Sequence, residues 1–267
     1  MAFDRVVCLT EETVETMYLL GQDHRIVGVT GYAIRPPRVR REKPRVGAFT
    51  SADCDKISAL NPDLVLTFSD LQADIAAELI RRGFAVHAFN QRSVRGILDM
   101  ITTLGRLFDC ADAANDLVTE FQNKLDRLAA TAHHPPLRVY FEEWDNPPIS
   151  GIGWVSELLR YAGGVDVFAN VAKEQGAKSR ILDAQDIIAA APNVIIASWC
   201  GKKVVTDKIK SRTGWDRIPA VQNDLVFEIK SPLILQPGPA ALTDGLDKLC
   251  DILRLARDHL NHKEHLR

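Results

Sequence analysis

Short apolar runs alternate with helical segments in the first third of the chain. Glu11–Leu20 and Leu71–Arg82 carry apolar residues three and four positions apart, and each is followed by a glycine, a common residue after the last turn of a helix. The runs predicted as strands are Val6–Leu9, Arg25–Val29, Leu64–Phe68 and Ala85–Phe89. This alternation predicts a parallel β-sheet with helices on both faces.

The middle of the chain has a different pattern. Residues 93–130 keep helical spacing without a proline, and only Gly96 and Gly105 weaken it. The strand–helix alternation then resumes after residues 133–136. We therefore expect one long, rigid helix that joins two α/β lobes. The expected parts are an N-terminal lobe over 1–92, a bridging helix over 93–134 and a C-terminal lobe over 135–267.

The two lobes share a sequence pattern. RVVCLT at 5–10 is similar to RVYFEEW at 138–144, and DKISALNPDLVLTFS at 55–69 is similar to DIIAAAPNVIIASW at 186–199. In the second pair a short helix ends at a proline turn, and the next strand ends in Phe68 or Trp199. The repeat predicts an α/β fold of two related, Rossmann-like lobes. A general likeness between any two strand–helix units is the alternative.

The predicted strand ends carry candidate ligand contacts, because ligands of open α/β sheets bind beyond the carboxyl ends of the strands. The stretch EEWDNPPISGIGW at 142–154 follows a strand and combines three carboxylates with two tryptophans. It is typical of a ligand-facing loop, and packing of Trp144 and Trp154 in the core is the alternative. Aromatic residues at the strand ends suit a large, partly apolar ligand; they are Tyr32, Phe49, Phe68, Phe89, Trp144, Trp154 and Trp199.

Composition excludes several classes of protein. The 267 residues carry a formal net charge of −2, which argues against a nucleic-acid or membrane-surface binder. No apolar run approaches the roughly 20 residues that span a bilayer. The five cysteines are scattered without a CxxC pair, so we expect free thiols and no metal site. The first residues show neither the basic start nor the apolar run of a signal peptide.

Residue patterns of common enzymes are absent. GxSxG, GxxxxGK[ST] and GxGxxG do not occur. Glu142 and Glu143 are adjacent, so a strand directs them to opposite faces and an acid–base pair is not expected. Cys200 follows a predicted strand, where it is either a soft ligand of a metal centre or a small buried residue. Arg35 and Arg38 lie in a basic run that is either solvated or contacts an anionic group of a ligand.

The order of these segments resembles that of class III substrate-binding proteins of ABC importers, the receptors for vitamin B12, iron–siderophores and haem. The resemblance rests on RVVCLTEETVETMYLLGQDHRIVGVT, ISALNPDLVLTFSD, SELLRYAGGVDVF and GWDRIPAVQNDLVFEI. VGVTGYAIRPP and NPPISG further resemble the cobalamin-binding branch. The likeness spans nearly the whole chain.

The resemblance implies that two lobes on a rigid helix hold a corrinoid in the cleft without chemistry. We therefore expect a receptor and not an enzyme, with no catalytic residue, no metal ligand and no cofactor. The ligand-binding candidates are Tyr32, Arg35, Phe68, Trp144, Asn146, Pro147, Trp154, Trp199, Cys200 and Leu233. The resemblance also implies a permease dimer as partner, docked through Asp74 and Asp216. We expect a monomer that binds no nucleic acid and does not insert into membranes.

Two alternatives stay open at this point. The same scaffold can carry an iron–siderophore or haem, with Tyr32, Arg35 and Arg38 on an anionic chelate. A cytoplasmic protein or enzyme that handles corrinoids is the other, suggested by the missing signal peptide and by Cys200. The resemblance implies a periplasmic location, whereas a native start at Met1 would indicate the cytoplasm.

Overall fold

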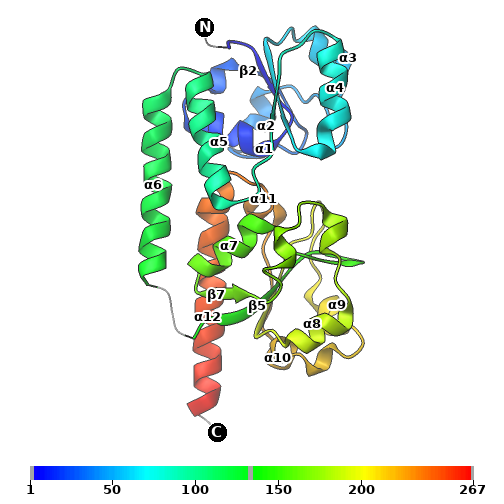
Figure 1. The fold of residues 1–267 in the computed structure, drawn as a ribbon, viewed down its shortest axis with the longest axis vertical. Helices are drawn as coiled ribbons and strands as arrows, with labels where there is room; N and C mark the ends of the chain where they lie inside the picture. Colours follow the sequence, from blue (N-terminus) through cyan, green and yellow to red (C-terminus); the bar gives the residue numbers. More distant parts are fainter. Residues whose placement is uncertain (1–2, 132–134, 266–267) are drawn as a thin grey trace. The chain divides into compact units, whose positions relative to one another are not determined.

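The structure, a computed structural model, describes residues 3–131 and 135–265. The chain divides into two compact units (Figure 1). The first unit comprises residues 1–91 and 95–120, and the second comprises 92–94 and 121–267. Each unit contains a β-sheet with helices, so the predicted α/β class is confirmed.

The first unit is built on a parallel sheet with the strand order β2-β1-β3-β4. All four predicted strands are present. The strands are β1 (Val6–Cys8), β2 (Ile26–Val29), β3 (Leu64–Phe68) and β4 (Val86–Phe89). The helices before residue 93 are α1 (Glu11–Leu19), η1 (Asp23–Arg25), α2 (Val39–Glu42), α3 (Cys54–Ala59), η2 (Asp70–Gln72) and α4 (Ala73–Arg81).

Alternating side chains of the central strands fill the core of the first unit. Val7 and Val65 meet Ile57 of α3 and Leu79 of α4 on one face of the sheet. On the other face the Cys8 thiol contacts Met17 of α1 (3.6 Å). Every residue of β3 is buried, which explains why four of its five residues, all but Thr67, are apolar.

The predicted helix stops at glycines are confirmed. Gly83 follows α4 with a φ of +88°, a conformation that costs a glycine little because it has no Cβ. The Phe84 amide then donates to the Leu79 carbonyl (3.1 Å), which satisfies an acceptor at the open end of the helix. Gly21 and Gly163 follow α1 and α7 in the same way.

The single helix expected over 93–130 is wrong in detail, because two helices occupy this segment. They are α5 (Val94–Leu107) and α6 (Ala111–Ala130). Asp109 adopts a left-handed φ of +54° between them, and the Cys110 amide donates to the Gly105 carbonyl (2.8 Å). This is the same helix-ending arrangement with aspartate in place of glycine. The long helix is α6, whose first ten residues belong to the first unit and the rest to the second. The expected end of the bridge at 132–134 lies outside the described residues.

The second unit repeats the strand order of the first. The long strand β5 pairs in parallel with β8 and β7, and β8 pairs with β9. The strands are β5 (Leu137–Asp145), β6 (Pro148–Ser150), β7 (Gly164–Asp166), β8 (Val194–Ala197) and β9 (Val226–Glu228). The helices are α7 (Gly153–Tyr161), η3 (Val171–Lys173), η4 (Ala177–Arg180), α8 (Ala184–Ala190), α9 (Thr206–Lys210), η5 (Trp215–Arg217), α10 (Pro219–Gln222), α11 (Ser231–Ile234), η6 (Ala241–Gly245) and α12 (Leu246–His265).

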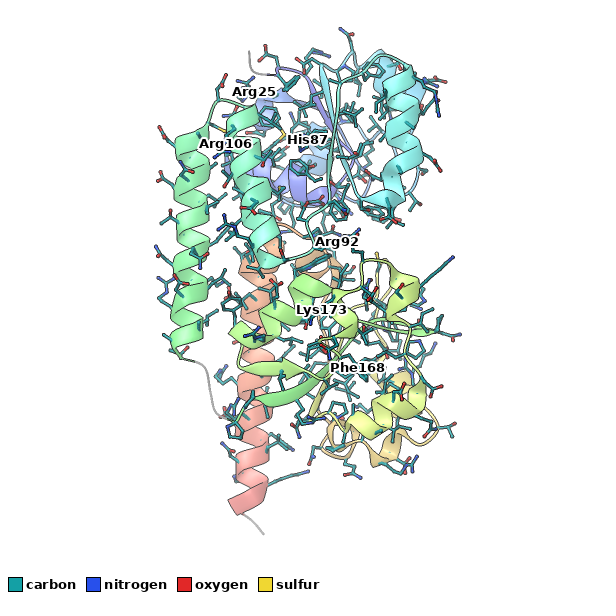
Figure 2. The ribbon with its side chains drawn as sticks, in the orientation of Figure 1. Arg25, His87, Arg92, Arg106, Phe168 and Lys173 are labelled. Atoms are coloured by element: carbon teal, nitrogen blue, oxygen red, sulfur yellow. The ribbon has the colours of Figure 1, made fainter. Side chains whose placement is uncertain are left out.

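Aromatic side chains fill one face of the second sheet. Tyr140 of β5 meets Trp215 and Phe168 edge to face, with ring centroids 6.2 and 5.7 Å apart. Figure 2 labels Phe168 against this sheet. Trp199 belongs to the same buried cluster. The aromatic residues of this unit therefore serve the core as well as the surface.

The predicted repeat is confirmed by one brace that occurs in both units. In the first, the Arg5 side chain donates to the Leu60 carbonyl and its backbone amide donates to Asp63 (3.0 Å). In the second, the Arg138 side chain donates to the Ala190 carbonyl (2.6 Å) and its amide donates to Asn193 (3.0 Å). Each brace ties the start of a central strand to the proline turn before its neighbour.

Replacing Gly105 with alanine is expected to destabilise the first unit. A Cβ at Gly105 would lie 2.3 Å from the Cβ of Ala114 on α6, and neither atom can rotate away. Alanine favours helix formation, but overpacking costs about 1–3 kcal/mol and outweighs that gain. Urea unfolding followed by circular dichroism should show a lower midpoint. Gly176→Ala is the matched control, since only the Ser179 hydroxyl lies within 4.0 Å of its added Cβ. Equal stability of both variants would contradict the close approach of α5 and α6.

Candidate ligand-binding site

The carboxyl ends of the first sheet carry the first group of predicted site residues. Tyr32 follows β2 and is 49% exposed, so much of its ring faces solvent. Arg35 donates from Nε to Glu15 Oε1 on α1 (2.8 Å), and its peptide bond to Pro36 is cis. Phe68 ends β3 as predicted but is only 4% exposed. Tyr32 and Arg35 therefore lie at the surface of this unit, and Phe68 lies mostly in its core.

Gln72 organises the same strand ends and was not predicted. Its Oε1 accepts from the Phe68 amide (3.0 Å), and its Nε2 donates to the carbonyls of Leu9 (3.2 Å) and Phe49 (2.7 Å). One buried side chain thus joins the ends of β1 and β3 to the loop before α3. Nothing in the sequence distinguishes this glutamine from an exposed helical one.

Two glutamates at the start of α1 have altered ionisation. Burial raises the pKa of the Glu12 carboxyl to about 8, although a hydrogen bond from Thr10 lowers it in part. Burial raises the pKa of Glu11 to about 7. Glu12 is 1% exposed, and its Oε1 has no hydrogen-bond partner. The start of α1 therefore holds protons at neutral pH that exposed glutamates would have lost.

A buried carboxylate organises the strand ends of the second sheet. Glu142 is fully buried on β5 and accepts from both terminal nitrogens of Arg212, the Nη2–Oε1 distance being 2.9 Å. The Trp199 indole also donates to it (3.0 Å), as does the Tyr140 hydroxyl (3.1 Å). The Arg212 guanidinium lies 4.4 Å from the centre of the Trp215 ring. Glu142 thus binds three separate segments together.

The two carboxylates that follow on β5 have their own cations. Glu143 has a different partner from Glu142 and accepts from Arg180 at 2.6 and 3.1 Å. Arg180 is 2% exposed. Asp145 pairs with the Lys202 ammonium (2.5 Å). Burial alone would raise the pKa of Asp145, but the pairing with Lys202 outweighs it and holds the pKa below its usual value.

Trp144 lies between these pairs and is the tryptophan nearest the surface of this group. It is partly buried against the core, and its indole donates to the Asn146 carbonyl (3.1 Å). The Lys202 ammonium lies 4.0 Å from the centre of its ring and 5.0 Å from that of Trp199. A lysine therefore covers part of the predicted aromatic platform.

Most of the predicted ligand-facing loop at 142–154 is a β-hairpin, and its last two residues begin α7. β5 runs to Asp145 and pairs antiparallel with β6, so only Asn146 and Pro147 form the turn. Both turn residues are exposed, and the bond between them is cis. Carboxylates interrupt the alternation of apolar and polar positions at 142–145, and each of them is paired with a cation.

The remaining predicted residues fall into three settings. Trp154 and Trp199 are each 3% exposed, and the Trp154 indole donates to the Ile234 carbonyl (2.9 Å). Leu233 on α11 is half-buried. The exposed ones are Cys200, after β8, and the two docking candidates Asp74 and Asp216, in the first turns of α4 and η5. Ligand contact and permease docking by these residues stay predictions.

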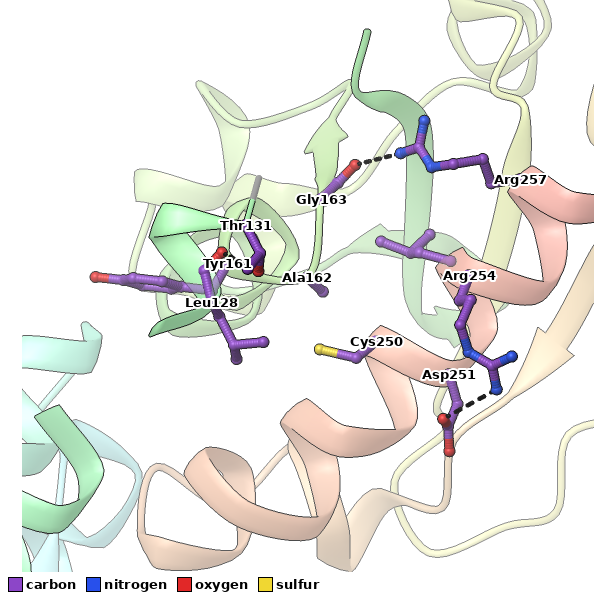
Figure 3. A pocket seen from close by; sticks show the side chains of 10 residues that line it. Leu128, Thr131, Tyr161, Ala162, Gly163, Cys250, Asp251, Arg254 and Arg257 are labelled. Atoms are coloured by element: carbon purple, nitrogen blue, oxygen red, sulfur yellow. Dashed lines mark hydrogen bonds and ion pairs between the residues drawn. The ribbon is translucent and has the colours of Figure 1, made fainter. Parts of the chain in front are cut away.

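A cavity of about 160 Å³ lies elsewhere in the second unit (Figure 3). Figure 3 shows the Cys250 side chain of α12 directed towards it beside Leu128 of α6. Arg257, also in its lining, donates to the Gly163 carbonyl (3.2 Å) next to β7. The volume of this cavity is well below the roughly 300–1,000 Å³ of ordinary ligand pockets. A corrinoid or haem does not fit there.

The described residues contain neither a metal cluster nor a membrane span. In residues 3–131 and 135–265, no three His, Cys, Asp or Glu side chains gather in a group that could hold a metal ion. Over the same part of the chain, no helix has the length and apolar character to cross a bilayer.

Comparison with known proteins defines the class. Residues 6–233 match the family described as periplasmic binding protein. The vitamin B12-binding protein of Vibrio cholerae is 25% identical over 95% of this chain and 90% of its own length. The crystal structure of periplasmic vitamin B12 binding protein BtuF of Vibrio cholerae superposes with a TM-score of 0.76 and 24% sequence identity. The superposition covers 96% of this chain and 98% of BtuF. The periplasmic heme-binding protein RhuT of Roseiflexus sp. RS-1 superposes with a TM-score of 0.78 and 20% sequence identity, over 94% of this chain and 99% of RhuT.

The fold is that of the class III solute-binding proteins, with two α/β units and a long helix. The chain belongs to the periplasmic binding protein family. Proteins of this family bind small ligands and deliver them to ABC permeases, and they are not enzymes. The resemblance seen in the sequence is thereby confirmed.

Stability of the protein should fall with rising pH because of Glu12. Its pKa is about 8 in the folded chain and 4.5 in a free side chain, so between these values the folded state keeps a proton that the unfolded state loses. The stabilising contribution is complete below pH 4.5 and is lost as the pH rises through 8. Urea midpoints of Glu12→Gln, measured from pH 5 to 8.5, should decline less than those of the wild type.

Glu120→Gln is the control for this measurement, because Glu120 is an exposed glutamate on α6. It removes the same charge without the burial. Parallel pH profiles for the wild type and Glu12→Gln would show that Glu12 is ionised in the folded protein.

Breaking the Glu142–Arg212 pair should destabilise the second unit strongly. Arg212→Met leaves a buried carboxylate without its cation, which costs about 3–5 kcal/mol. Adding Glu142→Gln should restore part of the loss, since an amide carries no charge and still accepts from Trp199. Chemical unfolding of the single and double variants measures this coupling. Arg254→Met, which removes an exposed arginine, should change stability by less than about 0.5 kcal/mol. Additive effects at Glu142 and Arg212 would contradict the pairing.

Proposed function

We propose that the protein is the receptor of an ABC importer and captures a corrinoid of the cobalamin type. The observation that carries the proposal is the 25% identity to a vitamin B12-binding protein over 95% of the chain. The proposal includes a periplasmic location, binding without chemistry, and transfer to a permease that docks at Asp74 and Asp216.

The surface chemistry of each unit supports a ligand with large apolar faces. Tyr32 in the first unit and Trp144 in the second expose aromatic surface at the carboxyl ends of parallel strands. Arg35 lies three residues after Tyr32 in the chain and Lys202 lies over the Trp144 ring, and each cation is paired with a carboxylate of the same unit. A corrinoid offers extended apolar faces and neutral amides, which suit rings beside neutralised charges.

Haem is the second candidate. The support for it is the structural likeness to the heme-binding protein RhuT, with a TM-score of 0.78. Haem carries two carboxylates, which would have to draw Arg35 or Lys202 away from Glu15 or Asp145. That exchange makes haem the less favourable ligand for this surface.

Titration of the purified protein with cyanocobalamin should show one site per chain by calorimetry. Trp144→Ala should weaken binding about tenfold, a loss of about 1.4 kcal/mol, because a ring face is removed from the contact. Trp144→Phe keeps a ring and should lose less. Parallel titrations with haem and a ferric hydroxamate separate the candidates. Absence of heat with cyanocobalamin at tens of micromolar, with saturable binding of haem, would replace the corrinoid by haem.

A further inference from the structure

The Lys202 ammonium lies over the ring of Trp144, a residue that we expect to contact a ligand. The Trp144 side chain packs against the buried cluster, and the indole N–H is fixed by the Asn146 carbonyl. The Lys202 ammonium lies 4.0 Å from the ring centre and contacts Asp145 at 2.5 Å. The Trp144 ring is therefore held in place, whereas the Lys202 side chain that contacts it can move.

The three ion pairs at the end of β5 differ in how easily they open. Glu142 is 0% exposed and Arg180 is 2% exposed, and both belong to pairs joined by two hydrogen bonds. Opening either pair would strand a buried charge. Lys202 is 40% exposed and Asp145 21%, and a single contact joins them. An exposed pair of this kind separates at little cost, because water solvates both ions.

We propose that Lys202 is a movable cover on Trp144. Its ammonium lies on the ring in the free protein and leaves it when the flat face of a ligand stacks there. Since the displaced ammonium stays nearby, the surface discriminates against ligands that carry a positive charge where they meet Trp144. Lys202 is then a specificity residue for neutral and anionic faces. The ligand part of this inference rests on the function proposed above, whereas the cover itself does not.

The cover can be tested without any ligand by acrylamide quenching of tryptophan fluorescence. The other three tryptophans, Trp154, Trp199 and Trp215, are 3%, 3% and 0% exposed, so quenching reports mainly on Trp144. Lys202→Ala should raise the quenching constant about twofold, because it uncovers the ring. Lys202→Arg should leave it unchanged, since arginine also stacks on tryptophan. The increase should vanish in the Trp144→Phe background.

Lys203→Ala is the matched control, because it removes the same charge from the next position in the chain, which is also exposed. It should behave as the wild type. Unchanged quenching in Lys202→Ala, or an equal increase in Lys203→Ala, would overturn the cover.

The same variants test the effect on binding, with cyanocobalamin as the probe. Lys202→Ala should bind it about fivefold more tightly, within roughly 3- to 30-fold, because the ligand no longer displaces a cation–π contact and an ion pair. Lys203→Ala should match the wild type. Weaker or equal binding by Lys202→Ala would overturn the role in specificity. If neither variant nor wild type binds cyanocobalamin, the corrinoid proposal fails, and the quenching results still decide whether Lys202 covers Trp144.

Discussion

The buried carboxylate of Glu142 is the constraint on which the second unit depends. A charge with no exposed surface is tolerated only when donors surround it, and here Arg212, Trp199 and Tyr140 supply them. The donors come from the segment after α9, the end of β8 and β5 itself. Glu142 therefore fixes the ends of two neighbouring strands and the chain after them. Lys202 lies three residues beyond Trp199, in the segment that the Trp199–Glu142 hydrogen bond anchors.

Three carboxylates within four residues would repel one another if all faced the same side. Each carboxylate instead meets a cation from a different segment of the chain. The burial of these pairs decreases from Glu142 to Asp145, and the cost of opening them decreases with it. The strand thus changes from a rigid core element into an adaptable surface within four residues. This gradient places the exposed cation Lys202 beside Trp144, the least buried tryptophan of the group.

Much of the fold could be predicted from the sequence, because local signals and tertiary packing agree there. The sequence correctly predicted the buried strand Leu64–Phe68, the end of the helix at Gly83 and the repeat of Arg5 at Arg138. The break at Asp109 was missed because aspartate adopts the left-handed conformation less often than glycine. The site was predicted less well, since its partners are distant in sequence: Glu142 and Arg212 are 70 residues apart. Trp199 shows why residue type alone is insufficient, because an aromatic side chain at a strand end can turn inward as well as outward.

Receptors of this fold include proteins described as binding vitamin B12 and heme, so the fold alone does not select the ligand. Selection must come from the few side chains that the strand ends expose. In this chain the strand ends carry the exposed ring of Tyr32 and the partly buried ring of Trp144, and the nearby chain contributes the cations Arg35 and Lys202, each paired with a carboxylate of its own unit. An anionic ligand must compete with these carboxylates for every contact it gains, whereas a neutral face only has to move a weakly held lysine. The binding of a large, neutral, flat ligand that we propose is consistent with this balance of charge, because a charged chelate of similar size would have to break more of these pairs.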